Sequence, residues 1–292
     1  MSFARVAVVG AGVMGQGISQ TVASTGTEVL LVDVNEEHIK VGLKALSDEM
    51  DREIERWGMT SSEKKAILSR IKTSVNIDSA QDYPVVIESI PEDLGQKKGL
   101  FAKLDNICPA ETILITNTST LSITEIGAAT KRPEKVIGLH FLNPVPKIPL
   151  VEIVRGLRTS DETYGRVREF GESLGKSSVK VFEYPGYVTT RIIVPLLNEA
   201  MHVLMEGVAT AQDIDNAIKL GYGFNIGPLA LADKMGLDVV MAWMENLLNE
   251  LSDHKYNPCP LLRKMVRAGN LGVKTGQGFF KYDKDGNRIL EE

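Results

Sequence analysis

The stretch RVAVVGAGVMGQGISQTVASTGTEVLLVD, residues 5–33, decides the fold. It begins with an apolar run at residues 6–9 that is typical of a buried strand, and a glycine-rich turn then leads into a helical pattern. A second apolar run follows at residues 29–32. Two strands joined by a crossover helix form a βαβ unit in which the strands pair in parallel. The sequence therefore predicts that the chain begins with part of a parallel sheet.

The turn of this unit carries Gly10, Gly12 and Gly15 in the spacing G-x-G-x-x-G, and Asp33 stands at the end of the second strand. The first glycine permits a tight turn, the second lets a pyrophosphate approach the backbone, and the third lets helix and strand pack closely. The helix N-terminus offers N–H groups to the phosphates. Asp33 can accept hydrogen bonds from the adenine ribose and would repel a 2′-phosphate, so NAD is the predicted cofactor. A glycine turn that binds no phosphate is the alternative.

Composition excludes several classes of protein. The 292 residues, 43% of them hydrophobic, are enough for two domains with cores of their own. The 33 basic and 38 acidic residues are scattered along the chain, which argues against a nucleic-acid surface. Cys108 and Cys259 lack metal-ligand spacing, so we predict reduced thiols and no metal site. Without a signal peptide, a transit segment or a long apolar span, we expect a cytoplasmic protein and no membrane partner.

Strand and helix patterns alternate as far as residue 184. A helix pair is predicted over residues 36–71, with Thr60 or Ser61 as the cap of its second helix. Apolar strand patterns then follow at residues 83–90, 112–120, 135–142 and 149–154, with helical patterns between the first three of them. Such alternation indicates a doubly wound, largely parallel sheet. Residues 1–184 are therefore predicted to form an α/β, Rossmann-like NAD-binding domain.

The character of the sequence changes near Pro185-Gly186. Long helical patterns follow at residues 191–207, 210–221 and 227–251. The first of them has apolar residues on more than one face, which is more than packing within one domain requires. We therefore predict that residues 185–292 form an all-helical C-terminal domain for substrate capping and dimerisation, with a second copy of the chain covering the excess apolar surface.

His140 and Glu152 lie in GLHFLNPVPKIPLVEIVRG, residues 138–156. Ligands bind at the strand ends of open α/β sheets, which places the region around His140 and the NTST block, residues 117–120, at the cofactor crevice. A histidine can take a proton from an alcohol while hydride leaves the same carbon for NAD. Glu152 stands between two apolar residues and needs a partner to offset the burial of its charge. Taken alone, a structural histidine and a solvent-facing glutamate remain alternatives.

Together these motifs resemble the L-3-hydroxyacyl-CoA dehydrogenase family, including the bacterial 3-hydroxybutyryl-CoA dehydrogenases. The resemblance rests on GAGVMGQGI, NTSTLSITEI, GLHFLNPVP, PLVEIV, PGYVTTR and LGVKTGQGFFKY, and so covers nearly the whole chain. It implies an oxidoreductase of fatty acid metabolism and β-oxidation, which reversibly oxidises a (S)-3-hydroxyacyl-CoA thioester to the 3-oxo form with NAD. It also implies a homodimer.

The resemblance assigns roles to individual residues. His140 is expected to be the general base, Glu152 to orient it and stabilise its charged form, and Ser119 to hydrogen-bond the substrate oxygen. Asn143 is expected beside both the nicotinamide and the substrate. Further contacts to NAD are expected from the glycine loop and from the motifs around it, namely from Val13, Met14, Glu92, Lys97, Asn117, Ser119 and Lys274.

Thr190 is a departure from the family. Relatives usually read P-G-F-V-x-N-R where this chain reads PGYVTTR, residues 185–191, and the asparagine helps to bind the carbonyl end of the substrate. The shorter threonine can still donate one hydrogen bond, directly or through a water. We expect an altered substrate or a slower enzyme. The helix pair also departs, because SDEMDREIER, residues 47–56, mixes both signs of charge where relatives carry lysines near the CoA phosphates.

Two other functions fit these residues. Thr190 leaves open a related 3-hydroxy-acid dehydrogenase that acts on a sugar acid or carnitine, and comparing free 3-hydroxy acids with their CoA thioesters separates it from the first interpretation. A non-catalytic NAD-binding protein is the other, because a fold does not by itself imply turnover. It predicts tight NAD binding without activity on any 3-hydroxyacyl thioester.

Overall fold

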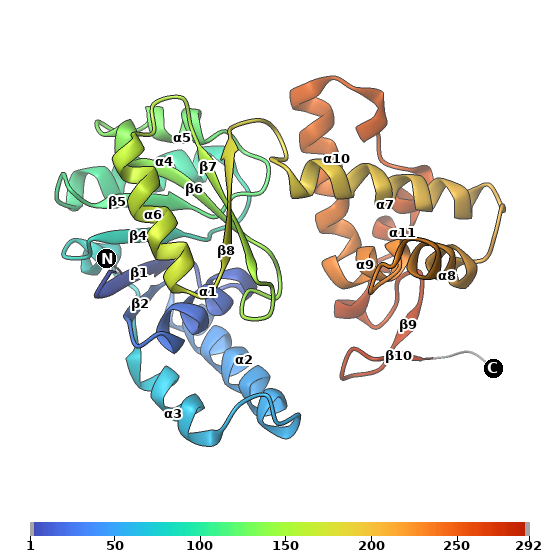
Figure 1. The fold of residues 1–292 in the computed structure, drawn as a ribbon, viewed down its shortest axis with the longest axis horizontal. Helices are drawn as coiled ribbons and strands as arrows, with labels where there is room; N and C mark the ends of the chain where they lie inside the picture. Colours follow the sequence, from blue (N-terminus) through green and yellow to red (C-terminus); the bar gives the residue numbers. More distant parts are fainter. Residues whose placement is uncertain (1–2, 290–292) are drawn as a thin grey trace. The chain divides into compact units, whose positions relative to one another are not determined.

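The structure, a computed structural model, describes residues 3–289. Its contacts divide the chain into two compact units, one that ends at Tyr184 and one that begins at Pro185. The first runs from blue to yellow in Figure 1 and the second from gold to red. Each has its own hydrophobic cluster of buried residues, which is the property that distinguishes two domains from one.

An eight-stranded sheet forms the centre of the first unit, in the order β3-β2-β1-β4-β5-β6-β7-β8. Neighbouring strands pair in parallel except β6 and β7. The chain order reverses between β1 and β4, which is the doubly wound arrangement that the sequence predicts and which leaves a crevice at the carboxyl ends of these strands. The strands are β1 (Arg5–Val9), β2 (Glu28–Val32), β3 (Ile71–Ser74), β4 (Val85–Glu88), β5 (Ile113–Thr116), β6 (Val136–Phe141), β7 (Leu150–Arg155) and β8 (Ser177–Phe182).

Helices cover both faces of this sheet (Figure 1). On one face, Ile18, Ile67 and Val167 from three different helices join the buried cluster of the strands. On the other face, Phe101 and Ile126 are buried against the sheet. The helices of this unit are α1 (Val13–Ser24), α2 (Glu36–Glu55), α3 (Ser61–Arg70), α4 (Leu94–Ile107), α5 (Ile123–Ala128) and α6 (Asp161–Ser173).

Side-chain caps determine where several of these helices begin. Thr60 accepts a hydrogen bond from the Glu63 N–H and the Glu63 carboxylate returns to the Thr60 N–H, so α3 starts with a complete capping box. This confirms the predicted helix pair and identifies Thr60, not Ser61, as the cap. Asp93 caps α4 and Ser122 caps α5 by a single side-chain acceptor each, for the N–H groups of Gln96 and Glu125. Strand β3, which follows α3 directly, was not indicated by the sequence pattern.

β7 runs against its neighbour β6. The two strands are joined by residues 142–149, a connection shorter than the roughly dozen residues that a parallel crossover requires. The chain must therefore turn back, and the pairing is antiparallel. β8 then pairs with β7 in parallel, after the crossover through α6. The single reversal in the sheet thus lies at the segment that contains His140 and Glu152.

The second unit is helical, as predicted, apart from one short hairpin. The sequence pattern at residues 227–251 suggested a continuous helix, but the structure has two, because Gly236 between them takes a positive φ of 99°. Strands β9 (Lys281–Tyr282) and β10 (Arg288–Ile289) pair antiparallel, which the sequence analysis did not expect. None of the helices within residues 3–289 combines the length and the hydropathy that crossing a membrane requires. The helices are α7 (Thr189–Met205), α8 (Ala211–Tyr222), α9 (Pro228–Met235), α10 (Leu237–Leu251) and α11 (Pro260–Arg267).

A buried carboxylate holds the segment before β9 against α9. Asp233 accepts hydrogen bonds from the N–H groups of Phe279 and Phe280, at 2.9 and 3.0 Å, and from the Tyr282 hydroxyl at 3.0 Å. Burial raises the pKa of Asp233 to about 6, although these hydrogen bonds act in the opposite direction. The carboxyl therefore binds its proton more tightly in the folded than in the unfolded chain.

The free energy of unfolding is expected to fall between about pH 4 and pH 6 because of Asp233. The unfolded residue titrates near 3.8 and the folded one at about 6, so raising the pH through this window favours the unfolded chain. Asp233→Asn removes this titration. The free energy of unfolding of the native protein minus that of the variant should therefore fall as the pH rises from about 4 to about 6. Unfolding followed across this range tests it, with the exposed Asp285→Asn as control; a pH-independent difference contradicts the prediction.

Candidate active site

His140 and Glu152 lie directly opposite each other on neighbouring strands. The antiparallel register of β6 and β7 pairs His140 with Glu152, between the pairs Leu139–Ile153 and Phe141–Val151. Because successive side chains of a strand alternate between faces, both ionisable side chains point to one face of the sheet. A side chain added at Gly138, two residues before His140, would meet Ile123 of α5. The dyad therefore lies on the face that α4 and α5 cover.

The two side chains are buried and joined by a short hydrogen bond. His140 Nδ1 is 2.7 Å from Glu152 Oε2, and the side chains are 4% and 1% exposed. An ionised carboxylate can only accept, so Nδ1 carries the proton and Nε2 keeps its lone pair. Nε2 lies 3.1 Å from Ser119 Oγ. An imidazole in this state can take a proton at Nε2, and the carboxylate stabilises the imidazolium that results.

The loop after β5 brings Ser119 to the imidazole. The Asn117 side-chain oxygen accepts a hydrogen bond of 2.9 Å from the Phe141 N–H, and the Asn117 N–H donates to the Glu88 carbonyl oxygen at 2.9 Å. Asn117 thus connects the start of the loop to β6 on one side and to β4 on the other. The structure therefore brings Ser119, His140 and Glu152 together, as the sequence predicts.

The glycine turn between β1 and α1 leaves room for a phosphate. Gly10 has a φ of 109°, and a side chain there would collide with the Ser89 carbonyl group. A side chain at Gly15 would collide with the Gly10 carbonyl oxygen, whereas one at Gly12 would meet nothing within 4 Å. Helix α1 has no side-chain cap at Gly12, so a ligand can take that place. These residues fit the pyrophosphate of NAD.

Asp33 holds the glycine turn and stays ionised. Its Oδ2 accepts a hydrogen bond of 2.7 Å from the Ala11 N–H, and its Oδ1 accepts one of 2.7 Å from the Val34 N–H and lies 3.0 Å from His38 Nδ1. Partial burial acts to raise the pKa of Asp33, but these interactions outweigh it and the pKa lies below its ordinary value. At neutral pH the carboxylate is therefore available to ribose hydroxyls.

A second buried carboxylate, Glu88, was missed by the sequence analysis. It ends β4, is fully buried, and lies 2.5 Å from Lys97 Nζ. It also accepts hydrogen bonds from the Ile90 N–H and the Thr116 hydroxyl, at 2.7 and 2.6 Å. Burial raises the pKa of Glu88, while Lys97 and both hydrogen bonds act in the opposite direction. The signal was available, because VVIES, residues 85–89, places an acid in an apolar strand as PLVEIV does.

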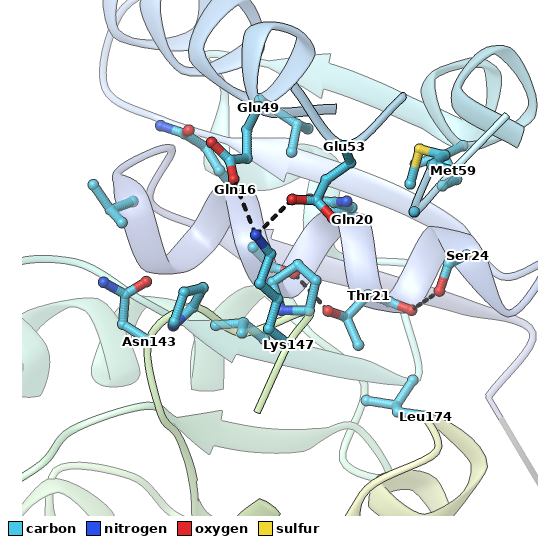
Figure 2. A pocket seen from close by; sticks show the side chains of 18 of the residues that line it. Gln16, Gln20, Thr21, Ser24, Glu49, Glu53, Met59, Asn143, Lys147 and Leu174 are labelled. Atoms are coloured by element: carbon cyan, nitrogen blue, oxygen red, sulfur yellow. Dashed lines mark hydrogen bonds and ion pairs between the residues drawn. The ribbon is translucent and has the colours of Figure 1, made fainter. Parts of the chain in front are cut away.

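A groove of about 610 Å³ lies within the first unit, between α1, α2 and the connection from β6 to β7. Asn143 and Val13 contribute to its lining. Figure 2 shows Lys147 reaching across it toward two carboxylates of α2, with Nζ 2.5 Å from Glu53 Oε1 and 3.6 Å from Glu49 Oε1. Its volume is in the range of small-molecule sites.

Four other residues that were predicted to contact NAD or the substrate lie at the start of α1 or in the second unit. Val13, at the start of α1, is largely exposed, whereas Met14 packs against the core of the first unit. Thr190 is buried in the first turn of α7, and Lys274 pairs with Asp238 at 2.6 Å, both within the second unit. The roles expected for these residues remain predictions.

Comparisons with known proteins cover both units. Residues 5–184 match a family model described as 3-hydroxyacyl-CoA dehydrogenase, NAD binding domain, and residues 186–282 match one described as 3-hydroxyacyl-CoA dehydrogenase, C-terminal domain. A probable 3-hydroxybutyryl-CoA dehydrogenase of Bacillus subtilis is 47% identical over 97% of this chain and 99% of its own. The 3-hydroxybutyryl-CoA dehydrogenase of Clostridioides difficile is 45% identical over 96% and 100%.

Solved structures share the whole fold. The crystal structure of (S)-3-hydroxybutyryl-CoA dehydrogenase from Ralstonia eutropha superposes with a TM-score of 0.88, at 43% identity, over 97% of this chain and 100% of that one. A 3-hydroxybutyryl-CoA dehydrogenase from Escherichia coli gives a TM-score of 0.88 at 37% identity, over 96% of this chain and 60% of that one. At this similarity both units of the chain have counterparts in proteins of known structure.

Proposed function

Because this chain belongs to the 3-hydroxyacyl-CoA dehydrogenase family, which interconverts (S)-3-hydroxyacyl-CoA and 3-oxoacyl-CoA with NAD, we propose two details of its reaction. The acyl group of the substrate has four carbons, and His140 is the general base. The first proposal is supported by relatives at 45 and 47% identity that are named for 3-hydroxybutyryl-CoA. The observation that carries the second is the hydrogen bond of 2.7 Å between His140 Nδ1 and Glu152 Oε2.

During oxidation, His140 Nε2 takes the proton of the 3-hydroxyl group as the carbon–oxygen double bond forms. NAD, when bound, supplies the acceptor for the hydride that leaves carbon 3. Glu152 stabilises the imidazolium, and Ser119 donates a hydrogen bond to the substrate oxygen. In the reverse direction, His140 returns the proton to that oxygen. The burial of the dyad strengthens each of these electrostatic interactions because water is excluded from them.

The residues proposed to hold NAD lie at the carboxyl ends of β1, β2 and β4. Open space at Gly12 and the N-terminus of α1 receive the pyrophosphate. Asp33 accepts the ribose hydroxyls and repels a 2′-phosphate, which favours NAD over NADP. We assign this cofactor to residues 1–184, and substrate capping to residues 185–292, in which Thr190 contributes to the substrate contacts.

We assign the CoA part of the substrate to the groove in the first unit. The groove includes Asn143, which follows β6 and therefore His140 closely in the chain. Lys147 brings a positive charge into it and pairs there with Glu49 and Glu53 (Figure 2). Phosphate oxygens can replace these carboxylates as partners of the ammonium group.

The surface of the second unit supports a homodimer. Ile192 on α7, Leu220 and Tyr222 on α8, and Val208 between these helices are large apolar side chains that stay exposed in the single chain. Exposed apolar surface of this kind marks protein–protein contacts. We also place the enzyme in the cytoplasm, which agrees with the two free, buried cysteines.

An assay of the purified protein with NADH and acetoacetyl-CoA tests the proposed function. Loss of absorbance from the reduced cofactor should be rapid with acetoacetyl-CoA and negligible with free acetoacetate. A 3-oxoacyl-CoA with a chain of about eight carbons should give a lower kcat/KM than the four-carbon thioester. Turnover of the free acid at a comparable rate would favour a 3-hydroxy-acid dehydrogenase, and NADH binding without any turnover would favour a non-catalytic protein.

A further inference from the structure

Glu92 holds the loop that carries Ser119. Its Oε1 accepts hydrogen bonds from the Thr118 hydroxyl at 2.5 Å, the Ser119 N–H at 2.9 Å and the Thr120 N–H at 3.2 Å. The Thr120 hydroxyl adds a fourth, at 3.3 Å. One carboxylate oxygen thus gathers donors from three successive residues. Such an arrangement fixes the backbone on both sides of the serine.

The other oxygen of Glu92 faces a lysine that has almost no contact with solvent. Lys97 is 1% exposed, and its Nζ lies 3.4 Å from Glu92 Oε2, 2.5 Å from Glu88 Oε1 and 3.2 Å from the Ile90 carbonyl oxygen. An ammonium group has three protons to donate. Three acceptors therefore surround Lys97, and its charge holds Glu92 from the side opposite to the loop.

The end of this series of contacts is the proposed catalytic group. Ser119, whose N–H is bound by Glu92, has its hydroxyl 3.1 Å from His140 Nε2. The other end is Glu88, which is fixed on β4 and fully buried. Because hydrogen bonds depend steeply on distance and angle, a small displacement of the loop would misplace the hydroxyl that the reaction uses.

We propose that Glu92 is a positioning residue, which acts on the reaction through Ser119 and is itself held by the buried Lys97–Glu88 pair. The proposal rests on the function assigned above, because it uses the role of Ser119 toward the substrate oxygen. It gives Glu92 and Lys97 a role in holding the loop in addition to the predicted contact with NAD. Removing Glu92 should then affect kcat more than cofactor affinity.

A double-mutant cycle between Glu92→Ala and Ser119→Ala tests this proposal. Each single variant is expected to lower kcat with acetoacetyl-CoA about a hundredfold, as loss of one donor to a developing charge does. The double variant should be no slower than the slower single variant, because residues that act as a unit are not additive. Glu92→Gln keeps an oxygen for the loop and should retain most of the native kcat.

Three results would overturn the proposal. The first is a kcat of the double variant that is lower by the product of the two single effects. The second is a Glu92→Ala variant that binds NADH more weakly but keeps the native kcat. The third is a Glu92→Gln variant that is as slow as Glu92→Ala. If Glu92→Ala does not fold, Thr118→Val provides the test, because it leaves the carboxylate in place but removes a donor to Glu92, together with the acceptor that this hydroxyl offers to the Leu121 N–H. It should lower kcat with no change in NADH binding measured by fluorescence, and an unchanged kcat contradicts the proposal.

Hydrogen exchange gives a measurement that does not depend on turnover. The Ser119 N–H donates to Glu92, so exchange in the segment 117–121 should become about tenfold faster in Glu92→Ala than in the native protein. Unchanged exchange shows that Glu92 does not hold the loop. If the native protein does not reduce acetoacetyl-CoA, the proposed function fails, but this result still decides whether the loop depends on Glu92.

Discussion

Replacing His140 with alanine is expected to lower kcat for acetoacetyl-CoA reduction about a thousandfold. In this direction the imidazolium donates the proton that the substrate oxygen receives as hydride arrives. His140 Nε2 lies 3.1 Å from the hydroxyl of Ser119, the group proposed to bind that oxygen. Loss of a general acid or base costs about 10²–10⁴ in rate. The NADH dissociation constant should stay near the native value, because the residues proposed to hold the pyrophosphate and the adenine ribose follow β1 and β2.

His254→Gln is the matched control for this substitution. His254 lies on the exposed segment after α10 in the second unit, so its replacement should leave kcat within about twofold of native, as surface substitutions usually do. Both variants should give native circular dichroism and bind NADH. A His140→Ala enzyme that keeps more than about a tenth of the native kcat would show that His140 is not the base.

Glu152→Gln is expected to lower kcat by a factor of about 100 to 1,000. The amide has nearly the same shape as the carboxylate, so the fold and the 2.7 Å contact to Nδ1 need little adjustment. What is lost is the negative charge that stabilises the imidazolium. If the amide nitrogen instead turns toward the ring, Nδ1 must accept a hydrogen bond from it and Nε2 then carries the ring proton, which is the wrong tautomer for a base.

The exposed Glu111→Gln provides the control for the loss of one negative charge from the same unit. The double variant His140→Ala/Glu152→Gln decides whether the two residues act as a pair. If they do, it is about as slow as His140→Ala alone, because Glu152 has no imidazolium left to stabilise. A double variant slower by the product of the two single effects would assign Glu152 a role that is independent of His140.

Local sequence patterns predicted the parts of the site that follow from chemistry. The spacing of Gly10, Gly12 and Gly15 indicates a turn that only residues without a side chain can form near a phosphate, and the collisions that a side chain would cause at two of them agree with this. Likewise, Glu152 between apolar residues indicates a partner, because an unpaired buried carboxylate is costly. The structure identifies that partner as His140.

Glu88 also lies in an apolar strand, but the sequence analysis did not predict that it is buried and paired. Its partners lie on two other elements, Lys97 on the helix α4 and Thr116 on the strand β5, and no spacing along the chain connects them. The four hydrogen bonds of Glu92 to the loop after β5 are also invisible in the sequence, because they join residues 26 to 28 positions apart. Tertiary contacts of this kind require the sheet order.

The boundaries that the sequence analysis missed have local causes. Gly236 fits a helical pattern by its neighbours, but its positive φ ends α9 and starts α10. Strands β9 and β10 pair over only two residues each, too short for a periodic pattern to be recognised. β3 has exposed or half-buried residues throughout, and therefore lacks the apolar run that made the inner strands of the sheet recognisable.

Insertions and deletions should be tolerated very differently along the segment from His140 to Glu152. A residue added to the connection at 142–149 lengthens a loop and leaves β6 and β7 aligned, so the imidazole still meets the carboxylate. One residue added within β7 between Val151 and Glu152 turns the carboxylate to the opposite face, among the apolar side chains that pack on α6. Evolution and design are therefore free to reshape the groove through this loop while the two strands keep a constant length.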